Sequence, residues 1–489
     1  MADGTADENV FEIQQGVAIM VGRRGSSSST VTAHDLSGTR EQKYSWLAAH
    51  SALTAGSQIH PAAPLYLFRA QDSTQSEEYG AGVPLPELMA QNGEPAPGFV
   101  TTHDEFAISW TASESAEKVE RLLATKSETE ARAIFTLCSQ NQWNYARAKA
   151  ALADGSWRKH VVKVLYRPFD FRWTVYSSHV AVHRRERVMR HMLGRANLGI
   201  ICTRQTKDQW GVLATRNIAA HKTCGAYDIN FLFPLYLLPE SGELSLGHND
   251  ERVNLAPSVV RRFGDALGLQ IHKQTGLPAG LTPEDIFHYA YAVLHSPGYR
   301  NRYAEFLKID FPRLPLTGNL ELFRALAKLG GELVSLHLLE FEVGTSRRDV
   351  PARAAAGGTN AQRANNASDG AAERGVDGAA RHPYQALTTF VREAVKSIPT
   401  VEKVSHTKNT VWINKAQTSG FRGVPENVWN FHIGGYQVCE KWLKDRKGRP
   451  LSDDDLAHYG KIVIALTETI RLMAEIDDVI GKHGGWPLK

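Results

Sequence analysis

A run of six polar residues, Arg204-Gln205-Thr206-Lys207-Asp208-Gln209, directly follows an apolar segment that is typical of a short buried strand. Its arginine and glutamine side chains carry the paired hydrogen-bonding groups that can recognise base edges in the major groove of DNA. A second run, Thr215-Arg216-Asn217, follows the next apolar segment and has groups of the same kinds. Because side chains at the end of a strand can project from a loop, we interpret both runs as candidates for reading bases.

Another group of cations, Arg184-Arg185-Glu186-Arg187, lies just past a short predicted strand. Guanidinium groups in a loop can bind phosphates, which fix the register of a duplex but carry no sequence information. A solvated surface explains these three arginines about equally well. The full set of candidate DNA-binding residues is Arg172, Arg184, Arg185, Arg187, Arg204, Gln205, Lys207, Arg216, Asn217 and Lys222.

The charge of the chain is unevenly distributed. Trp157–Lys222 has 14 Lys and Arg residues against three acidic residues, a net charge of +11, although the whole chain carries only +4. A second basic stretch, Val395–Pro450, has ten Lys and Arg residues against four acidic residues. Such concentration is expected for a protein that binds a polyanion. A solvated basic face is the alternative, and charge alone does not separate the two.

Several neighbouring residues have a structural interpretation that competes with DNA binding. In Arg167-Pro168-Phe169-Asp170, the proline fixes a turn and Asp170 can pair with Arg167 or Arg172, so we favour a structural role. The aromatic residues that could stack on bases, but that more often form core, are Trp173, Tyr176 and Trp210. The cations that could clamp a DNA backbone, but that a solvated helix face explains slightly better, are Lys441, Lys444, Arg446, Lys447 and Arg449.

The sequence lacks the motifs of several catalytic classes. Gly460-Lys461 and Gly481-Lys482 are not followed by the hydroxyl residue that holds magnesium in a nucleotide-binding P-loop. There is no Gly-x-Gly-x-x-Gly, Gly-x-Ser-x-Gly or zinc-deaminase pattern, and none of the 19 histidines has a metal-ligand spacing. We therefore expect no catalytic residue, metal site or cofactor site in this chain.

The elements that must position the candidate residues belong to an ordinary globular protein. The 489 residues suffice for about three domains, and 42% apolar and 22% charged residues are typical values. No apolar run approaches the ~20 residues that span a bilayer, and the acidic N-terminus does not resemble a secretory signal. The four cysteines are scattered, which fits a reducing cytoplasm.

Apolar spacing predicts the strands. Gly16–Val21 is expected to be a buried strand. Alternation in Phe171–Tyr176 predicts a strand with its large apolar side chains on one face and Arg172 and Thr174 on the other. Further strands are expected at Gly199–Arg204, Gly211–Arg216 and Ile229–Leu238.

Capping residues predict the helices. Thr39-Arg40-Glu41-Gln42 is a capping box, and Thr282-Pro283 and Ser452-Asp453 are also typical helix starts. Residues 115–154 have helical spacing, with a break near Asn141–Asn144. Residues 345–381 are rich in Ala, Gly, Asn and Arg and are expected to form a disordered linker.

Three long stretches together resemble one family. They are Tyr166–Trp173 with the following His183–Gly194 and Asn197–Gln205, then Leu281–Pro315, and Val428–Pro450. They are similar to the C-terminal specificity region, or target-recognition region, of type ISP restriction-modification enzymes. These single-chain enzymes combine nuclease, helicase, adenine-methyltransferase and target-recognition parts. Asn9–Ile19 also resembles the tail of an adenine-specific DNA methyltransferase domain.

The resemblance implies a DNA-recognition part without the rest of the enzyme. The chain has no Asn-Pro dipeptide and no Phe-x-Gly-x-Gly, which the methyltransferase of the family needs, and no helicase motifs. S-adenosylmethionine, ATP and magnesium would therefore belong to other parts of the parent enzyme. The implied partners are double-stranded DNA and a methyltransferase or helicase-nuclease chain, with no membrane.

We therefore predict an α+β fold with a mixed β recognition core, helical supports and a C-terminal helix. The expected divisions are a methyltransferase remnant with strands at 1–70, a loop-rich connector at 71–114, the recognition domain at 115–344, the linker at 345–381 and a C-terminal segment at 382–489 that packs on the recognition domain. Sequence-specific recognition of duplex DNA without catalysis is the leading interpretation. Two alternatives stay open, namely an adenine-N6 methyltransferase completed by another chain and a non-catalytic interaction scaffold.

Overall fold

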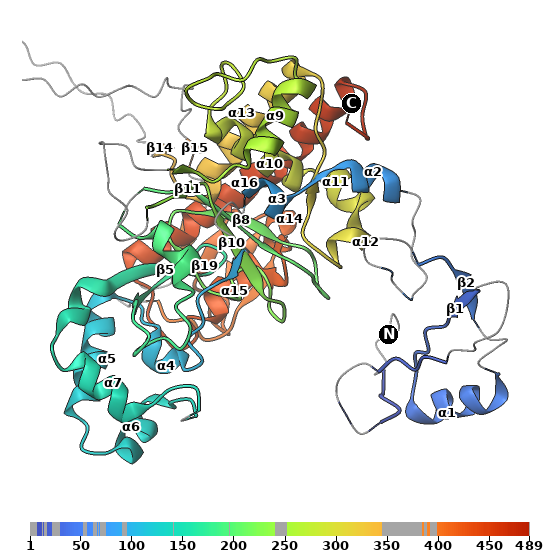
Figure 1. Ribbon diagram of the computed structural model, residues 1–489. Coiled ribbons are helices and arrows are strands. Elements are labelled where there is room, and N and C mark those ends of the chain that lie inside the picture. The colour runs from blue at the N-terminus through green and yellow to red at the C-terminus, as the bar shows by residue number, and fades with distance from the viewer. Residues whose placement is uncertain are drawn as a thin grey trace, which may run out of the picture. The chain divides into compact units, whose positions relative to one another are not determined.

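The computed structural model in Figure 1 describes residues 7–11, 13, 17–21, 30–51, 56–61, 66, 68, 75–89, 95–139, 141–194, 196–239, 252–344, 384–385, 389–391 and 399–488. The chain divides into two compact units, Met1–Ser76 and Glu77–Lys489. The predicted disordered linker at 345–381 lies outside the described residues. No helix in the described ranges is both long enough and apolar enough to cross a bilayer.

The N-terminal unit contains one helix and one strand pair. Helix α1 (Arg40–Ala49) begins at the predicted capping box, in which Thr39 and Gln42 exchange hydrogen bonds with each other's backbone. Strand β1 (Val31–Ala33) pairs antiparallel with β2 (Ser57–Ile59). The prediction of a buried strand at Gly16–Val21 is wrong for its described part, since residues 17–21 form no strand and expose their apolar side chains. No described strand pairs with residues 17–21, so their backbone groups form no sheet hydrogen bonds among the described residues.

A four-stranded antiparallel sheet lies at the centre of the second unit. Its order is β4 (Ala96–Pro97), β10 (Asn230–Pro234), β7 (Gly199–Thr203) and β8 (Val212–Thr215). Every residue of β7 and β8 is buried, which explains why these strands are continuous apolar runs rather than alternating ones. The predicted strands at 199–204 and 211–216 are confirmed with slightly shorter bounds.

A three-stranded sheet carries the first part of the basic segment. Strand β5 (Val161–Arg167) pairs antiparallel with β6 (Asp170–Val175) and parallel with β9 (Ile218–Ala219). The predicted alternation in β6 exists, but the buried face is the polar one. Asp170, Arg172 and Thr174 are buried, whereas Phe171 and Trp173 are only half-buried.

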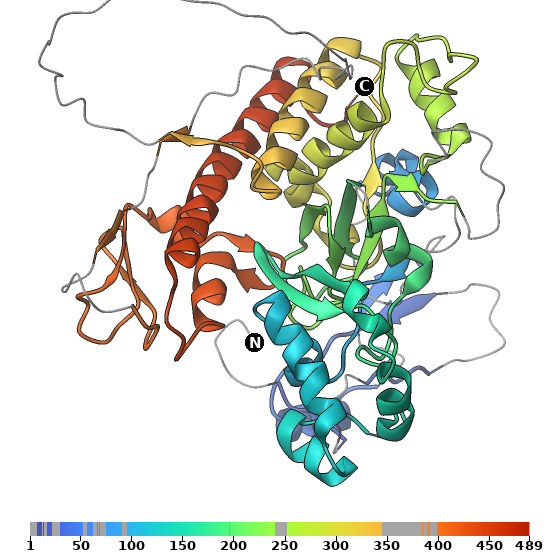
Figure 2. The same ribbon diagram turned by 90° about the vertical axis from the view of Figure 1, so that its left-hand side faces the viewer.

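Three long helices form the main helical layer. Helix α10 (Pro283–His295) and α16 (Asp453–Lys482) both begin at the predicted helix starts, where the structure shows capping boxes, and α13 (Leu320–His337) packs against each of them. Figure 2 shows the long red α16 running beside the gold α13. Gly330 permits this packing, because a Cβ atom there would lie 1.9 Å from the carbonyl oxygen of His288 in α10.

A separate small core is built from the helices predicted at 115–154. It contains α5 (Ala112–Ala124), α6 (Glu128–Phe135) and α7 (Tyr145–Leu152), which Figure 1 shows grouped together. The predicted break is confirmed, since Asn144 caps the start of α7 through a hydrogen bond from the Arg147 amide.

The C-terminal part adds small strands and helices before α16. A four-stranded sheet has the order β16 (Thr389–Val391), β19 (Gly420–Arg422), β18 (Thr410–Trp412) and β17 (Ser405–Thr407). Next come α14 (Glu426–Trp429), the hairpin β20 (His432–Ile433) and β21 (Tyr436–Gln437), and α15 (Val438–Lys444). The chain is thus α+β with a long C-terminal helix, as predicted.

The remaining elements are short and connect these parts. They are α2 (Ser76–Ala81), β3 (Val83–Pro84), α3 (Leu85–Met89), α4 (Asp104–Ala107), η1 (Ser156–His160), α8 (Glu186–Met189), η2 (Arg190–Met192), β11 (Tyr236–Leu237), β12 (Arg252–Val253), α9 (Pro257–Ala266), α11 (Pro297–Arg302), α12 (Ala304–Leu307), β13 (Arg313–Leu314), β14 (Val343–Gly344) and β15 (Tyr384–Gln385).

Candidate nucleic-acid interface

The two basic stretches of the sequence meet at a buried carboxylate. Asp170 Oδ2 lies 2.6 Å from Arg172 Nη2, and Asp170 Oδ1 lies 3.0 Å from Arg446 Nη2. All three side chains are buried. Burial alone would raise the pKa of Asp170, but the charges and hydrogen bonds of Arg446 and Arg172 outweigh burial and lower it. The carboxylate therefore stays ionised and ties strand β6 to the segment after α15.

Aromatic rings complete this cluster. The Arg172 guanidinium lies 3.2 Å from the centre of the Trp110 ring, and the Arg446 guanidinium lies 3.4 Å from that of Trp442. Arg172 was predicted to bind DNA, but its charged group is engaged by Asp170 and shielded from solvent. Because Arg172 is buried, it is not among the DNA contacts that we propose. Its pairing with Asp170 explains why the polar face of β6 points inward.

The strand register divides the other candidates between two ends of the central sheet. Thr203 at the end of β7 pairs with Asn230 at the start of β10, so the loops at 204–211 and 220–229 leave the same end. We call them the paired loops. Thr215 at the end of β8 pairs with Gly199 at the start of β7, so Arg216 and Asn217 lie at the opposite end. Five residues of strand span roughly 15 Å, so the two predicted base-reading runs are not adjacent.

The paired loops carry four of the predicted residues, which are Arg204, Gln205, Lys207 and Lys222. The first three are exposed and Lys222 is half-buried. Arg204 Nε donates to Asp310 Oδ1 over 2.9 Å, in a pair whose side chains are 55% and 42% exposed. Burial lowers the pKa of the adjacent His221, against a hydrogen bond to the Phe99 carbonyl that raises it, so the ring is mainly neutral at neutral pH.

One carboxylate joins the paired loops to each other. Asp228 Oδ2 accepts hydrogen bonds from Thr206 Oγ1 over 2.8 Å and from the Lys207 amide over 3.1 Å. The Asp208 amide also donates to Thr206 Oγ1 over 3.0 Å. These bonds fix the backbone at Lys207 while its side chain stays in solvent.

The C-terminal hairpin of β20 and β21 packs against the loop at 220–229. The Gly435 amide donates to the Cys224 carbonyl over 3.2 Å, and the Tyr436 hydroxyl donates to the Lys222 carbonyl over 3.1 Å. Gly434 has a φ of +57°, and a Cβ atom there would lie 1.6 Å from the Cys224 oxygen. Only a residue without a side chain permits this approach, so the Gly434–Gly435 turn positions the loop at 220–229.

The candidates at the opposite end are engaged within the protein. Arg216 forms two hydrogen bonds to the Glu340 carboxylate, of 2.6 and 3.1 Å, although its side chain is 38% exposed. The Asn217 amide donates to Thr215 Oγ1 over 3.0 Å, which closes a tight turn. These residues retain exposed surface, but a ligand would have to displace the partner of Arg216.

Arg184, Arg185 and Arg187 lie in a third place, at and just before α8, which packs against β10. Arg184 Nη2 lies 2.5 Å from Glu186 Oε2, and the Arg184 guanidinium lies 5.6 Å from the centre of the Tyr176 ring. Arg185 and Arg187 are exposed, and Arg185 adopts a left-handed backbone with a φ of +53°.

Other side chains near the paired loops were not among the predicted contacts. Arg167 lies 4.0 Å from the centre of the Tyr166 ring and 5.6 Å from that of Tyr436, and Lys441 lies 5.8 Å from the Tyr436 ring. Tyr227, in the loop at 220–229, is 78% exposed. The sequence signal for Tyr227 was an aromatic residue beside an aspartate just before a strand.

The aromatic residues considered for stacking belong mainly to the core. Tyr176 and Trp210 are buried, and the Trp210 indole donates to the Thr203 carbonyl over 3.2 Å. Trp173 is half-buried and faces Lys163. The interpretation of these rings as packing groups, rather than base-stacking groups, is therefore the better one.

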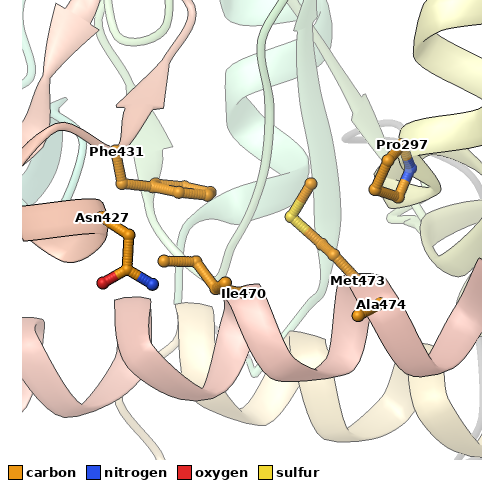
Figure 3. Close-up of a pocket in the computed structure, with 6 residues that line it drawn as sticks. All are labelled: Pro297, Asn427, Phe431, Ile470, Met473 and Ala474. Carbon is orange, nitrogen blue, oxygen red and sulfur yellow. The ribbon is translucent and has the colours of Figure 1, made fainter.

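The chain also has an apolar pocket of about 400 Å³, shown in Figure 3. Its lining residues are Pro297, Asn427, Phe431, Ile470, Met473 and Ala474. None of the predicted DNA contacts lines it, and Asn427 is the one polar residue among those that line it. Among the described residues, no group of three or more His, Cys, Asp or Glu side chains gathers in a way that could hold a metal ion.

Three solved structures have a similar fold. A cryo-EM structure of a DrdV–DNA complex is 19% identical, with a TM-score of 0.58, and the match covers 89% of this chain and 42% of that chain. A nuclease-deletion mutant of the type ISP restriction-modification enzyme LlaGI, in complex with a DNA substrate mimic, is 16% identical with a TM-score of 0.57 and coverages of 92% and 39%. The ATP-dependent type ISP restriction-modification enzyme LlaBIII, bound to DNA, is 15% identical with a TM-score of 0.55 and coverages of 87% and 26%.

This chain spans less than half the length of each of these proteins. A search of the curated proteins found no match. The family described as the type ISP C-terminal specificity domain matches residues 93–475. That range begins just before β4 and ends within α16, so it includes the central sheet, the paired loops and the helices that support them. The chain therefore belongs to the family of type ISP C-terminal specificity domains.

Proposed function

We propose that this chain recognises specific sequences in double-stranded DNA for a type ISP restriction-modification system, and that it contributes no catalytic group of its own. The observation that carries this proposal is the exposure of Arg204, Gln205 and Lys207 on paired loops that the C-terminal hairpin supports. Loops that hydrogen bonds join at one end of a buried sheet, and that present Arg204, Lys207 and Lys222, suit the holding of a duplex. The presence of DNA in the three structures of similar fold supports the same partner.

Within this proposal, the candidate residues have two kinds of role. Lys207, Lys222 and the arginines at 184, 185 and 187 bind phosphates, while Arg204 and Gln205 read base edges. Arg204 can exchange its ion pair with Asp310 for a base edge, because both side chains of the pair are exposed. An exposed ion pair contributes only about 0–1 kcal/mol, which a bidentate contact with guanine can replace. Arg216 and Asn217 form a second contact at the far end of the sheet.

Duplex binding measured against salt concentration tests the proposal. The logarithm of the binding constant should fall linearly with the logarithm of salt, by about 0.9 for each phosphate neutralised. Duplexes selected from a random pool should bind at least about 1,000-fold more tightly than shuffled ones. Failure to bind any duplex, or binding that ignores salt, would contradict it.

Charge-reversal variants test whether Arg204 and Lys207 contact DNA. Arg204→Glu combined with Lys207→Glu should weaken duplex binding strongly and reduce the salt slope by roughly 1–2. Lys328→Glu, at an exposed position on α13, is a control for charge alone and should have little effect. If the double variant binds as the unaltered chain does, the basic loops do not contact DNA, and the interaction-scaffold alternative gains support.

The second candidate function, as one part of an adenine-N6 DNA methyltransferase, is favoured by the N-terminal unit. That unit exposes several large apolar side chains, among them Ile19, Met20 and Val21, which are 66%, 81% and 65% exposed. Such a surface suits a partner domain. Transfer of labelled methyl groups from S-adenosylmethionine to duplex DNA by the purified chain would favour this candidate. No transfer by the chain alone, with transfer after a methyltransferase chain is added, would assign the chemistry to that partner.

A further inference from the structure

Two apolar side chains on the paired loops point to a more specific role. Tyr227 is 78% exposed and Ile229 is 48% exposed. Among the described residues of Glu77–Lys489, they are the only large hydrophobic side chains that are exposed. Every other large apolar side chain that the structure describes in this unit is buried or half-buried, whereas these two, separated by one residue, lie in solvent. Exposed apolar groups that are localised in this way indicate a binding surface.

The residue between them explains why they stay exposed. Asp228 turns toward the neighbouring loop, where its carboxylate accepts hydrogen bonds from Thr206 Oγ1 and the Lys207 amide. With Asp228 directed inward, the flanking Tyr227 and Ile229 stay in solvent. Gly225 permits the tight return of the chain, since a Cβ atom there would lie 2.7 Å from the Asp228 carbonyl oxygen.

The base of the loop is also fixed. Asn230 Oδ1 accepts a hydrogen bond from the Cys224 amide, and Asn230 Nδ2 donates to the Ala220 carbonyl, both over 3.0 Å. The Tyr436 hydroxyl contacts the Lys222 and Gly225 carbonyls from the C-terminal hairpin. Since both the base and the tip of the loop are tied down, Tyr227 is presented on a rigid support and cannot fold back easily onto the protein.

The charges around the pair indicate which apolar surface it meets. Arg204 and Lys207 are exposed on the adjacent loop, and the half-buried Lys222 lies near the start of the loop that carries Tyr227. An apolar protein partner would gain little from these cations. A DNA duplex instead offers phosphates on its outside and apolar base faces within, so cations and a central ring can be satisfied together.

We infer that Tyr227 and Ile229 form a wedge that inserts into the base stack of the bound duplex, and that Asp228 is the positioning residue that presents it. This inference rests on the proposed function, because the paired loops must first hold DNA. The wedge would open one base step while the surrounding cations keep the phosphates in place. Insertion of apolar side chains between bases is a known way in which proteins deform DNA.

Fluorescence of 2-aminopurine, which rises when the base loses its stacking, tests the wedge. The probe is a 30-base-pair duplex selected from a random pool by this chain, with 2-aminopurine placed at successive adenines. Binding should raise the fluorescence several-fold at one step, and Tyr227→Ala should abolish that rise. The same variant should lose about 5- to 100-fold in affinity, the range expected for one stacked base, without a change in salt slope.

Matched variants distinguish loss of the inserted Tyr227 ring from a general loss of structure. Tyr227→Phe should retain the fluorescence rise, and Tyr44→Ala, which removes an exposed tyrosine of the N-terminal unit, should leave both readouts unchanged. Asp228→Ala should abolish the rise although Tyr227 is present, and Asp228→Asn, which keeps an acceptor oxygen, should restore much of it. Salt-dependent binding without unstacking at any step would overturn the wedge but leave the proposed function standing. Absence of any duplex binding would overturn both.

Discussion

At the scale of single residues, Asp170 is the clearest case of a side chain whose role depends on its partners. It is buried between the guanidinium groups of Arg172 and Arg446, which come from positions two and 276 residues away in the chain. The neighbouring contact was predictable, because an acid and a base on one face of a strand pair readily. The distant one was not, since nothing in the local sequence shows that Arg446 will reach β6. Arg172, a predicted DNA contact, is therefore a buried residue of this cluster.

Removal of Asp170 should be strongly destabilising. Asp170→Ala leaves two buried arginines without their shared acidic partner, and breaking a buried pair in this way typically costs about 3–5 kcal/mol. Chemical denaturation of the unaltered and variant chains measures the difference. The control is Glu120→Ala, which breaks the exposed pair between Glu120 and Arg158 and should change stability by less than about 1 kcal/mol. Equal effects of the two substitutions would contradict the structural role of Asp170.

His337 makes the stability of the protein dependent on pH. Burial, assisted by the charge of Arg300, lowers the pKa of His337 to about 3, and its ring nitrogens contact the Tyr291 hydroxyl and Thr469 Oγ1. In the unfolded chain the histidine titrates near 6.5. As the pH falls below 6.5, the unfolded chain gains a proton that the folded chain does not bind, so stability is lost down to about pH 3.

The free energy of unfolding should therefore fall by about 2 kcal/mol between pH 7 and pH 5 through this group. His337→Gln, which keeps polar atoms but does not titrate, should remove that share of the pH dependence. Urea denaturation at the two pH values, with both proteins, gives the comparison. The same fall in the variant as in the unaltered chain would show that His337 is not held neutral in the folded state.

At the scale of elements, local signals predicted the helices with clear caps and several buried strands, but not α13, β5 or the C-terminal sheet. The helix starts predicted at Thr39, Thr282 and Ser452 are confirmed, because a cap is a contact between residues three apart. The buried strands β7 and β8 were evident as apolar runs between loops. The error at Gly16–Val21 arose because an apolar run becomes a strand only when another strand pairs with it.

The contacts that hold the paired loops in place could not be predicted from the sequence. Their connection depends on Asp228 contacting residues about 20 positions away, and their support comes from Gly434, more than 200 positions away. The basic composition of the region was visible in the sequence, but the sheet register that separates Arg204 from Arg216 was not. The predicted contacts therefore included the residues of the paired loops without distinguishing them from those at the other end.

Gly434→Ala tests the support given by the C-terminal hairpin. The added Cβ atom would overlap the Cys224 carbonyl oxygen, so the loop at 220–229 should shift and duplex affinity should fall by at least about 10-fold. Gly448→Ala is a matched control, because Gly448 also has a positive φ, of +79°, but a Cβ atom there would meet no other part of the protein within 4 Å. Equal affinities for the two variants would mean that the turn does not position the loop.

At the scale of the whole molecule, the family and the fold class were predictable from the sequence. Long ordered motifs carried the resemblance to the type ISP specificity region, and the family match over residues 93–475 confirms it. The resemblance of Asn9–Ile19 to a methyltransferase tail lies outside that match and stays a prediction. The predicted domain boundaries also stay predictions. The contact at Asp170 between the two basic stretches, which are far apart along the chain, was not predictable from the sequence.

Site-specific photocrosslinking from Gln205 tests the central claim most directly, because it asks whether the paired loops touch DNA. A photoreactive amino acid at Gln205 should crosslink to a duplex selected by this chain, with the crosslinks confined to a few adjacent base pairs. The same group at Lys328, on the exposed face of α13, should give none. A stable complex that crosslinks from Lys328 but not from Gln205 would contradict the assignment of the paired loops as the DNA-binding surface.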